Sequence, residues 1–379
     1  MANAFKMAEH AGQHVLQTAL SSGLSATEGV HNKKMNYVDP SFDGMTIVMP
    51  PDYVPTAQER VQFKGKNGNV PFPVISWGAW SWGDKATFHW SNDELPALKE
   101  AWKMVVEAGQ GWIDTAQAYG SGDSERITGE LTKGLPRDSF QIQTKWYVVP
   151  DNITNLIHPS AAPAKMLKES LKRMGLDYID CYLVHGHIHV SSIKQVAKGL
   201  AECVDSGMTK TVGVANYNKE DMIQLADELL KYDIPLATNQ CEYSVLRRLP
   251  ETSGLIQACR ERGIYFQSYS SLAQGRLSGK YHAGNEPPKE YRFSSYPMKD
   301  LEPTLQVLRE IAQRRGKPIS AVALNYNISK GILPVVGIRK PQQAQENLQA
   351  LGWRLSAEEM QALDRVSLEG KATKLWQQG

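Results

Sequence analysis

Three histidines alternate along one short stretch of the chain. The stretch YLVHGHIHV, residues 182–190, places His185, His187 and His189 two positions apart. In a strand such residues share one face, so three imidazoles could converge on a metal ion. Alternatively, His185 alone ends the strand and serves acid–base chemistry, while the other two lie past the strand end. The side chains on the neighbouring segments decide between these interpretations.

Other ionisable side chains also follow apolar runs of strand length. Asp114 lies in the run GWIDTA, and Tyr119 follows it by five residues. Lys145 ends the run FQIQTK, and His185 ends the run YIDCYLVH. Each residue alone has an ordinary structural role, such as a helix cap or a solvated strand end. Four of them at corresponding positions of three consecutive runs indicate a site.

These four groups suit one kind of chemistry. A tyrosine is a weak acid with an unperturbed pKa of about 10. A lysine cation favours the phenolate, so Lys145 is expected to lower the pKa of Tyr119 and make it a better proton donor. Asp114 would keep the ammonium charged and in place, and His185 would hydrogen-bond a substrate carbonyl oxygen. Such a site protonates a developing alkoxide, as carbonyl reduction by hydride transfer requires.

The elements that must position these residues alternate along the chain. Helix-periodic segments such as LPALKEAWKMVVEAG and APAKMLKESLKRMG separate the apolar runs. A doubly wound sheet would need a glycine fingerprint, but no third glycine completes the pattern begun by Gly120 and Gly122. The pattern therefore predicts an eight-stranded (β/α)8 TIM barrel, whose strands end at one shared mouth. The eight runs are VISWGA, GWIDTA, FQIQTK, YIDCYLVH, TVGVAN, ATNQCEY, IYFQSYS and ILPVVGI.

Two parts of the chain differ in pattern. Residues 61–379 form the predicted barrel unit, which begins with a β-hairpin whose turn is Asn67-Gly68. Residues 1–60 are expected to be a weakly structured extension. The start of the chain has no arginine, carries Glu9 and Glu28, and lacks the continuous apolar core of a signal peptide. We expect a cytoplasmic protein, with organelle targeting by the extension as the alternative.

Bulk composition excludes several classes of function. The net charge is +2 without any block of basic residues, which argues against nucleic-acid and membrane binding. No apolar run approaches the about 20 residues that a spanning helix needs. Four widely spaced cysteines, Cys181, Cys203, Cys241 and Cys259, predict free thiols in a reducing compartment. The expected partner is a small carbonyl compound.

In their order, these motifs resemble the aldo-keto reductase family over about residues 63–368. DTAQAYG matches the family's DTAxxYG element, and GDSERITGE resembles the segment that follows it. LKESLKRMGLDYIDCYLVH, TVGVANYN, ATNQCEYS, SYSSLAQGRLSGKY and VVGIRKPQQAQENLQAL follow in the expected order. The resemblance implies NADPH-dependent reduction of an aldehyde or ketone. It also implies the tetrad Asp114, Tyr119, Lys145 and His185, with Tyr119 as the general acid.

The resemblance further implies a cofactor site across the barrel mouth. Tyr269 would stack on the nicotinamide, while Asn216 and Gln240 would bind its carboxamide. Arg339 and Lys340 precede a helix, where basic side chains and backbone donors suit the 2′-phosphate. The implied cofactor residues are Gly78, Asn216, Gln240, Tyr269, Ser270, Leu272, Gly337, Arg339, Gln343, Glu346 and Asn347.

Three positions depart from the family's pattern. Ala215 stands where a serine is frequent, so one hydrogen bond to the carboxamide is lost. Ser271 stands where a proline is common. Gln343 replaces an arginine that grips the phosphate in some members, so we expect a smaller preference for NADPH over NADH.

Aromatic residues gather after the first and third runs. Packing under the loops is the commoner role for such residues. If even half of them line the mouth, the pocket is broad, apolar and suited to aromatic or bulky carbonyl compounds. The expected pocket residues are Trp80, Trp82, Trp146 and Tyr147, from a cluster that also includes Phe88 and Trp90.

The same residues permit three other interpretations. A metal site would be short of ligands because only His282 follows His189, so no metal is expected. Lys145 could be the Schiff-base lysine of an aldolase, although Asp114 beside it argues against a neutral amine. Some members of the family act as cofactor-binding regulatory subunits of membrane channels, for which residues 1–60 offer a candidate surface.

Overall fold

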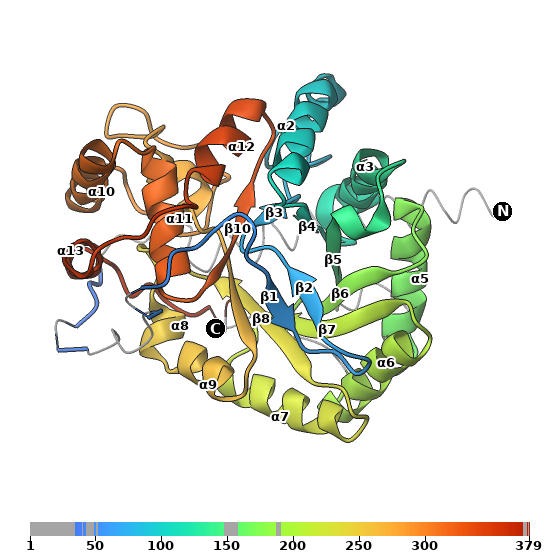
Figure 1. Cartoon of the computed structure of the whole chain (residues 1–379). Helices are drawn as coiled ribbons and strands as arrows, with labels where there is room; N and C mark the ends of the chain where they lie inside the picture. Colours follow the sequence, from blue (N-terminus) through green and yellow to red (C-terminus); the bar gives the residue numbers. More distant parts are fainter. Residues whose placement is uncertain are drawn as a thin grey trace.

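Eight parallel strands close into a barrel (Figure 1) in the order β10-β3-β4-β5-β6-β7-β8-β9. The computed structural model describes residues 35–39, 41–42, 49–50, 52–147, 158–186, 191–373, 377 and 379. The predicted (β/α)8 barrel is confirmed. The strands are β3 (Ser76–Gly78), β4 (Trp112–Asp114), β5 (Gln141–Trp146), β6 (Ile179–Val184), β7 (Thr209–Ala215), β8 (Leu236–Glu242), β9 (Tyr265–Tyr269) and β10 (Leu333–Gly337).

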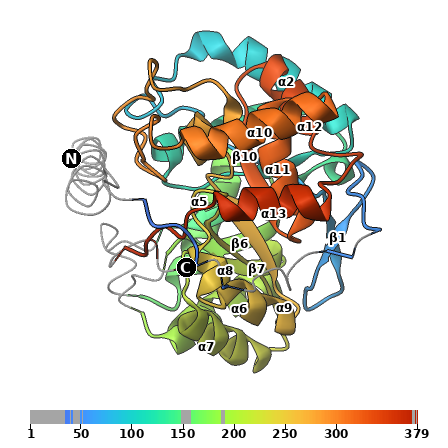
Figure 2. The same ribbon diagram turned by 90° about the vertical axis from the view of Figure 1, so that its left-hand side faces the viewer.

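Helices cover the outside of the barrel, and Figures 1 and 2 show them around the strands. Strand β6 is buried along its whole length, as expected for a parallel strand covered on both faces. The helices are α2 (Leu95–Glu107), α3 (Asp123–Thr132), α5 (Ala162–Met174), α6 (Ile193–Asp205), α7 (Lys219–Leu230), α8 (Leu249–Thr252), α9 (Leu255–Glu261), α10 (Glu302–Arg315), α11 (Ile319–Ser329), α12 (Pro341–Leu348) and α13 (Ala357–Arg365).

Local sequence signals account for where these helices begin and end. Helix α5 ends at Gly175, which takes the left-handed conformation (φ 68°) that closes a helix without a Cβ clash. Helix α6 begins with a capping box in which the side chains of Ser192 and Gln195 each bond the other's backbone N–H. Its apolar side, which includes Val196 and Leu200, is buried. The alternation of strand and helix is therefore encoded locally.

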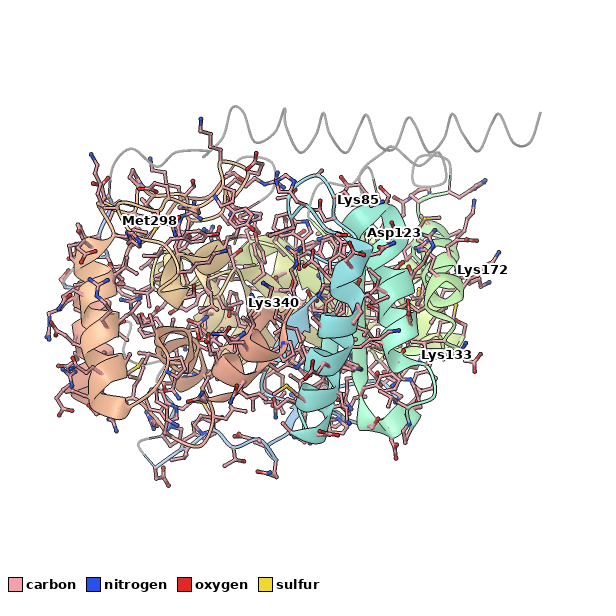
Figure 3. The ribbon with its side chains drawn as sticks, turned by 90° about the horizontal axis from the view of Figure 1, so that it is seen from above. Lys85, Asp123, Lys133, Lys172, Met298 and Lys340 are labelled. Carbon is pink, nitrogen blue, oxygen red and sulfur yellow. The ribbon has the colours of Figure 1, made fainter. Side chains whose placement is uncertain are left out.

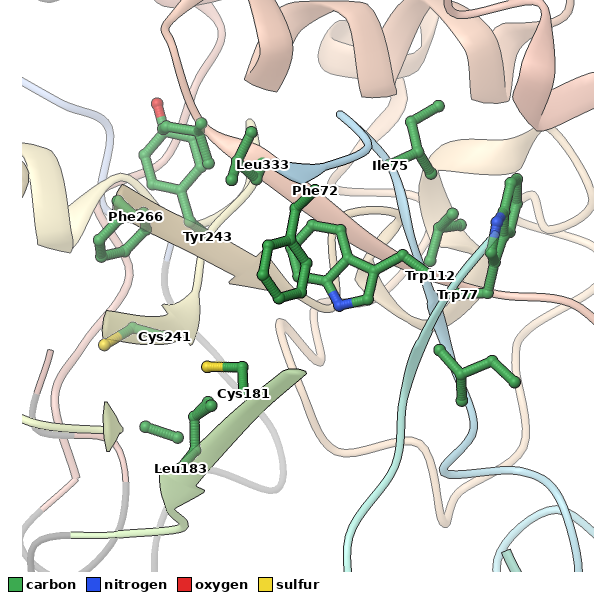
Figure 4. Packing of buried hydrophobic residues seen from close by; sticks show 14 of the residues in the cluster. Phe72, Ile75, Trp77, Trp112, Cys181, Leu183, Cys241, Tyr243, Phe266 and Leu333 are labelled. Carbon is green, nitrogen blue, oxygen red and sulfur yellow. The ribbon is translucent and has the colours of Figure 1, made fainter. Parts of the chain in front are cut away.

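The predicted β-hairpin is present at the end of the barrel opposite the mouth. Strands β1 (Val61–Phe63) and β2 (Val70–Phe72) pair antiparallel, so that Val61 faces Phe72. Phe72 packs edge-on against Trp112, the first residue of β4, with 4.9 Å between ring centres. Figure 4 shows the two rings side by side in the core. The hairpin therefore covers the amino ends of the strands.

The described parts of residues 35–60 contact the barrel. The backbone N–H of Val38 donates to Ser367 at 3.3 Å, and that of Met49 donates to Ser329 at 3.0 Å. The earlier part of the predicted extension lies outside the described residues, as do His187 and His189. Among the residues that the structure describes, none of the helices is long and apolar enough to cross a bilayer.

Candidate active site at the carboxyl ends of the strands

A buried lysine forms the centre of the site. The Nζ of Lys145, on β5, donates to Oδ2 of Asp114 at 2.7 Å and to the carbonyl oxygen of Thr115 at 2.9 Å. It also lies within hydrogen-bonding distance, 3.4 Å, of the Tyr119 hydroxyl oxygen. Lys145 is 0% exposed and Asp114 is 2% exposed. Barrel closure thus aligns three of the predicted tetrad residues.

His185 completes the group from the neighbouring strand. It directly follows β6, and its ring lies 5.5 Å from the Tyr119 ring, centre to centre, at 77°. Burial, together with the charge of Lys145, lowers the pKa of His185 well below its usual value. The imidazole is therefore neutral at neutral pH and can donate one hydrogen bond to a carbonyl oxygen.

One electrostatic expectation is wrong in direction. Burial raises the pKa of Tyr119 well above its usual value, and the Asp114 carboxylate adds to the effect. The charge of Lys145 does not outweigh this, because Asp114 already balances it at 2.7 Å. The phenol is therefore fully protonated at neutral pH, as a proton donor must be. An alkoxide is a stronger base than a phenolate and can still take this proton.

Close backbone packing positions the loop that carries Tyr119. A Cβ on Gly120 would lie 2.8 Å from the backbone of Gly83, and a Cβ on Gly83 would lie 2.6 Å from the Cβ of Asp123. Only glycine permits this approach, and both glycines have positive φ. Lys85 and Asp123, which belong to the two segments, are labelled in Figure 3. The loop after β3 therefore supports the loop after β4.

The segment GDSERITGE, residues 122–130, stabilises the loops after β3 and β4 by hydrogen bonds. The Ser124 hydroxyl donates to the Ala79 carbonyl at 2.8 Å and shares a hydrogen bond with Thr115 at 2.8 Å. Glu125 is fully buried and accepts a 2.6 Å hydrogen bond from Thr144, the neighbour of Lys145. This motif joins the ends of β3, β4 and β5.

A network of glutamines contacts the Asp114 carboxylate, and two of its members, Gln143 and Gln267, were not among the expected site residues. Gln143 donates to Oδ1 of Asp114 at 2.6 Å, and Gln240 donates to the same oxygen at 3.1 Å. Both also donate to Oε1 of Gln267 at 3.0 Å. The signal was available, because Gln143 and Gln267 precede Lys145 and Tyr269 by two residues and so share their strand faces.

The network also includes Gln240, which the family resemblance places at the cofactor carboxamide. Its side-chain amide is 2% exposed and donates to Asp114 and Gln267 inside the barrel. The expectation placed the end of this strand at Asn239 and Gln240, but β8 continues to Glu242. Gln240 therefore contacts Asp114, and its contact with the cofactor carboxamide stays a prediction.

Several of the expected cofactor residues do lie at the mouth. Gly78 and Gly337 are register partners at the ends of β3 and β10. A Cβ on Gly78 would lie 3.1 Å from Val335, so the strand ends form a cradle without side chains. The Tyr269 hydroxyl donates to Asn216 at 2.8 Å. This cradle, beside an aromatic ring and an amide, fits a flat, hydrogen-bonding ring such as nicotinamide.

The loop after β9 has an unusual backbone. Ser270, Ala273 and Gln274 have φ values of 51°, 47° and 51°, in the left-handed region. Non-glycine residues in this region are strained, and such strain clusters at functional sites. Leu272 lies between them and is half-buried. Ser270 and Leu272, both expected at the cofactor site, thus belong to a loop in a costly conformation.

The basic segment lies at the start of α12. Lys340 is its N-cap residue, and Figure 3 labels Lys340 close to α2. The backbone N–H of Arg339 donates to Gln343 at 2.8 Å, while Glu346 and Asn347 follow within the helix. The Arg339 side chain forms an ion pair with Glu94, a residue that the sequence analysis missed. No local signal joins these two residues, which are 245 positions apart.

Aromatic rings line the approach to Tyr119. The ring centres of Trp80 and Tyr119 are 6.3 Å apart, and Trp80 also packs edge-on against Phe88 and Phe293 at 4.9 and 5.6 Å. The guanidinium of Arg292 lies 5.7 Å from the Trp80 ring centre. Phe293 and Arg292 were not expected, because they come from the long segment after β9. Among the described residues, the surroundings of Tyr119 are therefore aromatic, with the Arg292 guanidinium over Trp80.

Two of the four expected pocket residues lie in the core and not in a pocket. Trp82 and Trp146 are 0% exposed and belong to the core. The Trp82 indole donates to the Ile338 carbonyl at 2.8 Å, a satisfied structural contact. Tyr147 is half-buried, with its ring centre 6.1 Å from that of His185. Trp80 and Tyr147 therefore stay candidates, whereas the other two pack.

Among the described residues, no three histidine, cysteine or carboxylate side chains cluster as metal ligands. His187 and His189 lie outside those residues, so experiment must test the three-histidine hypothesis. If the tetrad supplies the proton for a carbonyl reduction, no Lewis acid is needed, and exhaustive chelation is expected to leave that activity unchanged. Elemental analysis of the purified protein provides the second measurement. Activity that is lost on chelation and restored by zinc or iron would contradict this prediction.

Comparison with known proteins finds a matching family and several similar proteins. The profile of the aldo/keto reductase family matches residues 74–368. The chain is 30% identical over 324 residues to "Pyridoxal reductase, chloroplastic" of Arabidopsis thaliana, covering 81% of this chain and 86% of that protein. It is 28% identical over 343 residues to "L-glyceraldehyde 3-phosphate reductase" of Escherichia coli K12, covering 84% and 95%.

Solved structures show the same fold. A thermostable aldo-keto reductase crystallised with the inhibitor epalrestat superposes with a TM-score of 0.66 at 26% identity, covering 81% of this chain and 100% of that one. An aldo/keto reductase from Klebsiella pneumoniae, crystallised with NADP and acetate, gives a TM-score of 0.65 at 23% identity, covering 83% and 98%. The latter likeness concerns the fold alone.

Proposed function

The chain belongs to the aldo/keto reductase family, and on that premise we propose that it reduces an aldehyde or ketone to the alcohol with NADPH. In this proposal Tyr119 donates the proton. The observation that carries the proposal is the position of the Tyr119 hydroxyl, 3.4 Å from the buried Lys145 ammonium and beside the neutral ring of His185. When bound, NADPH supplies the hydride.

Each tetrad residue has a separate role. His185 donates a hydrogen bond to the substrate carbonyl oxygen and orients it. Tyr119 releases its proton to that oxygen as the negative charge develops. Lys145 then stabilises the phenolate, and Asp114 keeps Lys145 in place through its 2.7 Å ion pair. Asp114, Lys145 and His185 are buried and Tyr119 is half-buried, so these interactions act where water screens them little.

The proposed cofactor site extends from the tetrad to α12. Tyr269 and Asn216 would hold the nicotinamide end above the cradle of Gly78 and Gly337. Arg339, at the start of α12, would face the 2′-phosphate. Ser270, Leu272, Gln240, Gln343, Glu346 and Asn347 stay in the proposed site.

Aromatic aldehydes are the proposed substrate class. The Trp80 ring beside Tyr119, with Phe293 packed against it, supports this class, and so does the similarity to pyridoxal reductase. The test is NADPH oxidation with a panel of benzaldehydes, pyridoxal, glyceraldehyde 3-phosphate and short aliphatic aldehydes. We expect the highest kcat/KM for the flat aromatic compounds. A preference for the phosphorylated triose would instead point to Arg292 as an anion site.

The two other functions have less support. A Schiff-base aldolase needs an accessible amine, but Lys145 is 0% exposed and its Nζ is engaged by Asp114 and Thr115. Turnover in the aldehyde panel separates an enzyme from a regulatory binding subunit. A cytoplasmic location stays a prediction. Targeting to an organelle is a second proposal, because the Arabidopsis relative is named as a chloroplastic protein.

Replacing Arg339 by alanine is expected to weaken NADPH binding by about tenfold and NADH binding by less than about twofold. Only NADPH presents a phosphate to the guanidinium. Fluorescence titration of wild type and variant measures both affinities. Arg315→Ala is the matched control, because Arg315 forms the same kind of ion pair with Glu359, between α10 and α13. Equal losses of affinity for NADPH and NADH would mean that Arg339 only stabilises its loop.

A further inference from the structure

The guanidinium of Arg339 is already engaged by protein groups. Its Nε donates to Oε2 of Glu94 at 2.6 Å, and its Nη2 donates to the other carboxylate oxygen. Its Nη1 donates to the carbonyl of Phe88 at 3.0 Å, and the group lies 5.6 Å from the Trp90 ring centre. The edge with two parallel donors thus faces a carboxylate and cannot face a phosphate at the same time.

Glu94 is itself fixed by local structure. It ends the 3₁₀ turn Asn92–Glu94, directly before α2, and its Oε1 accepts a hydrogen bond from the backbone N–H of Ser91 at 3.2 Å. Burial raises the pKa of Glu94, but the hydrogen bonds from Arg339 and Ser91 outweigh burial and leave the pKa below its usual value. Glu94 is therefore charged at neutral pH and held in front of Arg339.

We propose that Glu94 limits the preference for NADPH over NADH by occupying Arg339. The 2′-phosphate of NADPH must displace this carboxylate or share the guanidinium with it. NADH has no such phosphate and meets no competition. This inference rests on the proposed function, since it concerns the proposed cofactor site, but it assigns to Glu94 a role in cofactor choice.

A carboxylate beside an arginine can also have the opposite effect and strengthen NADPH binding. A carboxylate can also orient an arginine and so prepare it for a phosphate on another edge. Here, however, Phe88 takes a donor of the remaining nitrogen at 3.0 Å. The arrangement therefore leaves few donors for a phosphate, which favours competition over preparation.

The experiment is the substitution Glu94→Gln, followed by titration of tryptophan fluorescence with NADPH and with NADH. Glutamine keeps the size of the side chain and can still reach back to the Ser91 N–H, but it removes the charge. We expect the Kd for NADPH to fall about three- to tenfold and that for NADH to change less than about twofold. In an Arg339→Ala background, the gain should disappear.

The chain contains a closely matched control. Arg315 donates three hydrogen bonds to Glu359, from Nε at 2.9 and 3.2 Å and from Nη2 at 2.6 Å. It also completes a capping box with Ser356, and Arg315 lies 5.8 Å from the Trp353 ring centre. Glu359→Gln should therefore cause the same local loss and leave both affinities at the wild-type values.

Each outcome has one meaning. NADPH affinity that is unchanged or weakened in Glu94→Gln overturns the inference, and so does an equal gain for both cofactors. In these cases the wild type still binds NADPH, and the proposed function stands. A wild-type protein that binds neither nucleotide would overturn the proposed function and this inference together.

Discussion

Tyr119→Phe is expected to lower the turnover of an aromatic aldehyde by at least about 10²–10⁴-fold, the usual contribution of general acid catalysis. The variant keeps the ring that packs near Trp80 and His185 but lacks the only proton that the ring can give. NADPH binding should be nearly unchanged, because the hydroxyl acts on the substrate oxygen. Steady-state kinetics and a fluorescence titration measure the two effects separately.

Tyr265→Phe is the matched control for this substitution. Tyr265 begins β9 at the opposite end of the barrel, and its hydroxyl accepts a hydrogen bond from the Gln62 N–H at 3.3 Å. Its loss removes one hydroxyl without touching the site. A Tyr119→Phe enzyme that retains more than about a tenth of wild-type turnover would show that another group donates the proton.

Asp114→Asn should lower turnover by about 10²- to 10³-fold and change its pH dependence. Burial lowers the pKa of Lys145, and Asp114 opposes this by raising it. Without the carboxylate, the pKa of Lys145 falls further. A lysine loses its charge as the pH rises through its pKa, so the loss of activity on the alkaline side should begin at lower pH than in wild type.

The same substitution should also affect stability. Leaving one member of a buried ion pair without its partner costs about 3–5 kcal/mol. Asp205→Asn is the control, because Asp205 pairs with Lys66 at 2.7 Å with both side chains partly in solvent. That pair should contribute less than about 1 kcal/mol and leave the pH profile unchanged. An unchanged alkaline limb in Asp114→Asn would mean that Asp114 does not control the charge of Lys145.

The sequence by itself determined the barrel and the ends of several strands. Parallel strands that are buried on both faces must be apolar runs, and the amphipathic segments between them must be helices. The hairpin turn at Asn67-Gly68 is equally local, since Gly68 has a φ of 116° that suits glycine alone. Once the strand ends are known, Asp114, Lys145 and His185 must meet at one mouth.

Only the tertiary structure decided which side chains face one another across the barrel. Periodicity gives the face of a strand but not its partners across the barrel, so the hydrogen bond from Gln240 to Asp114 was not expected. The same limit applies to Trp82 and Trp146, because an aromatic residue after a strand has the same pattern whether it packs or lines a pocket. The raised pKa of Tyr119 depends on burial, which arises only when the barrel closes.

The pair of Glu94 and Arg339 is the clearest case. Each residue has an ordinary local reason to be present, one as the acid of a capping box and the other as a basic residue before a helix. Their contact joins segments 245 residues apart. It exists because barrel closure places β10 beside β3, so that the loops that follow these two strands meet. Such a contact depends on the whole fold, and no local pattern encodes it.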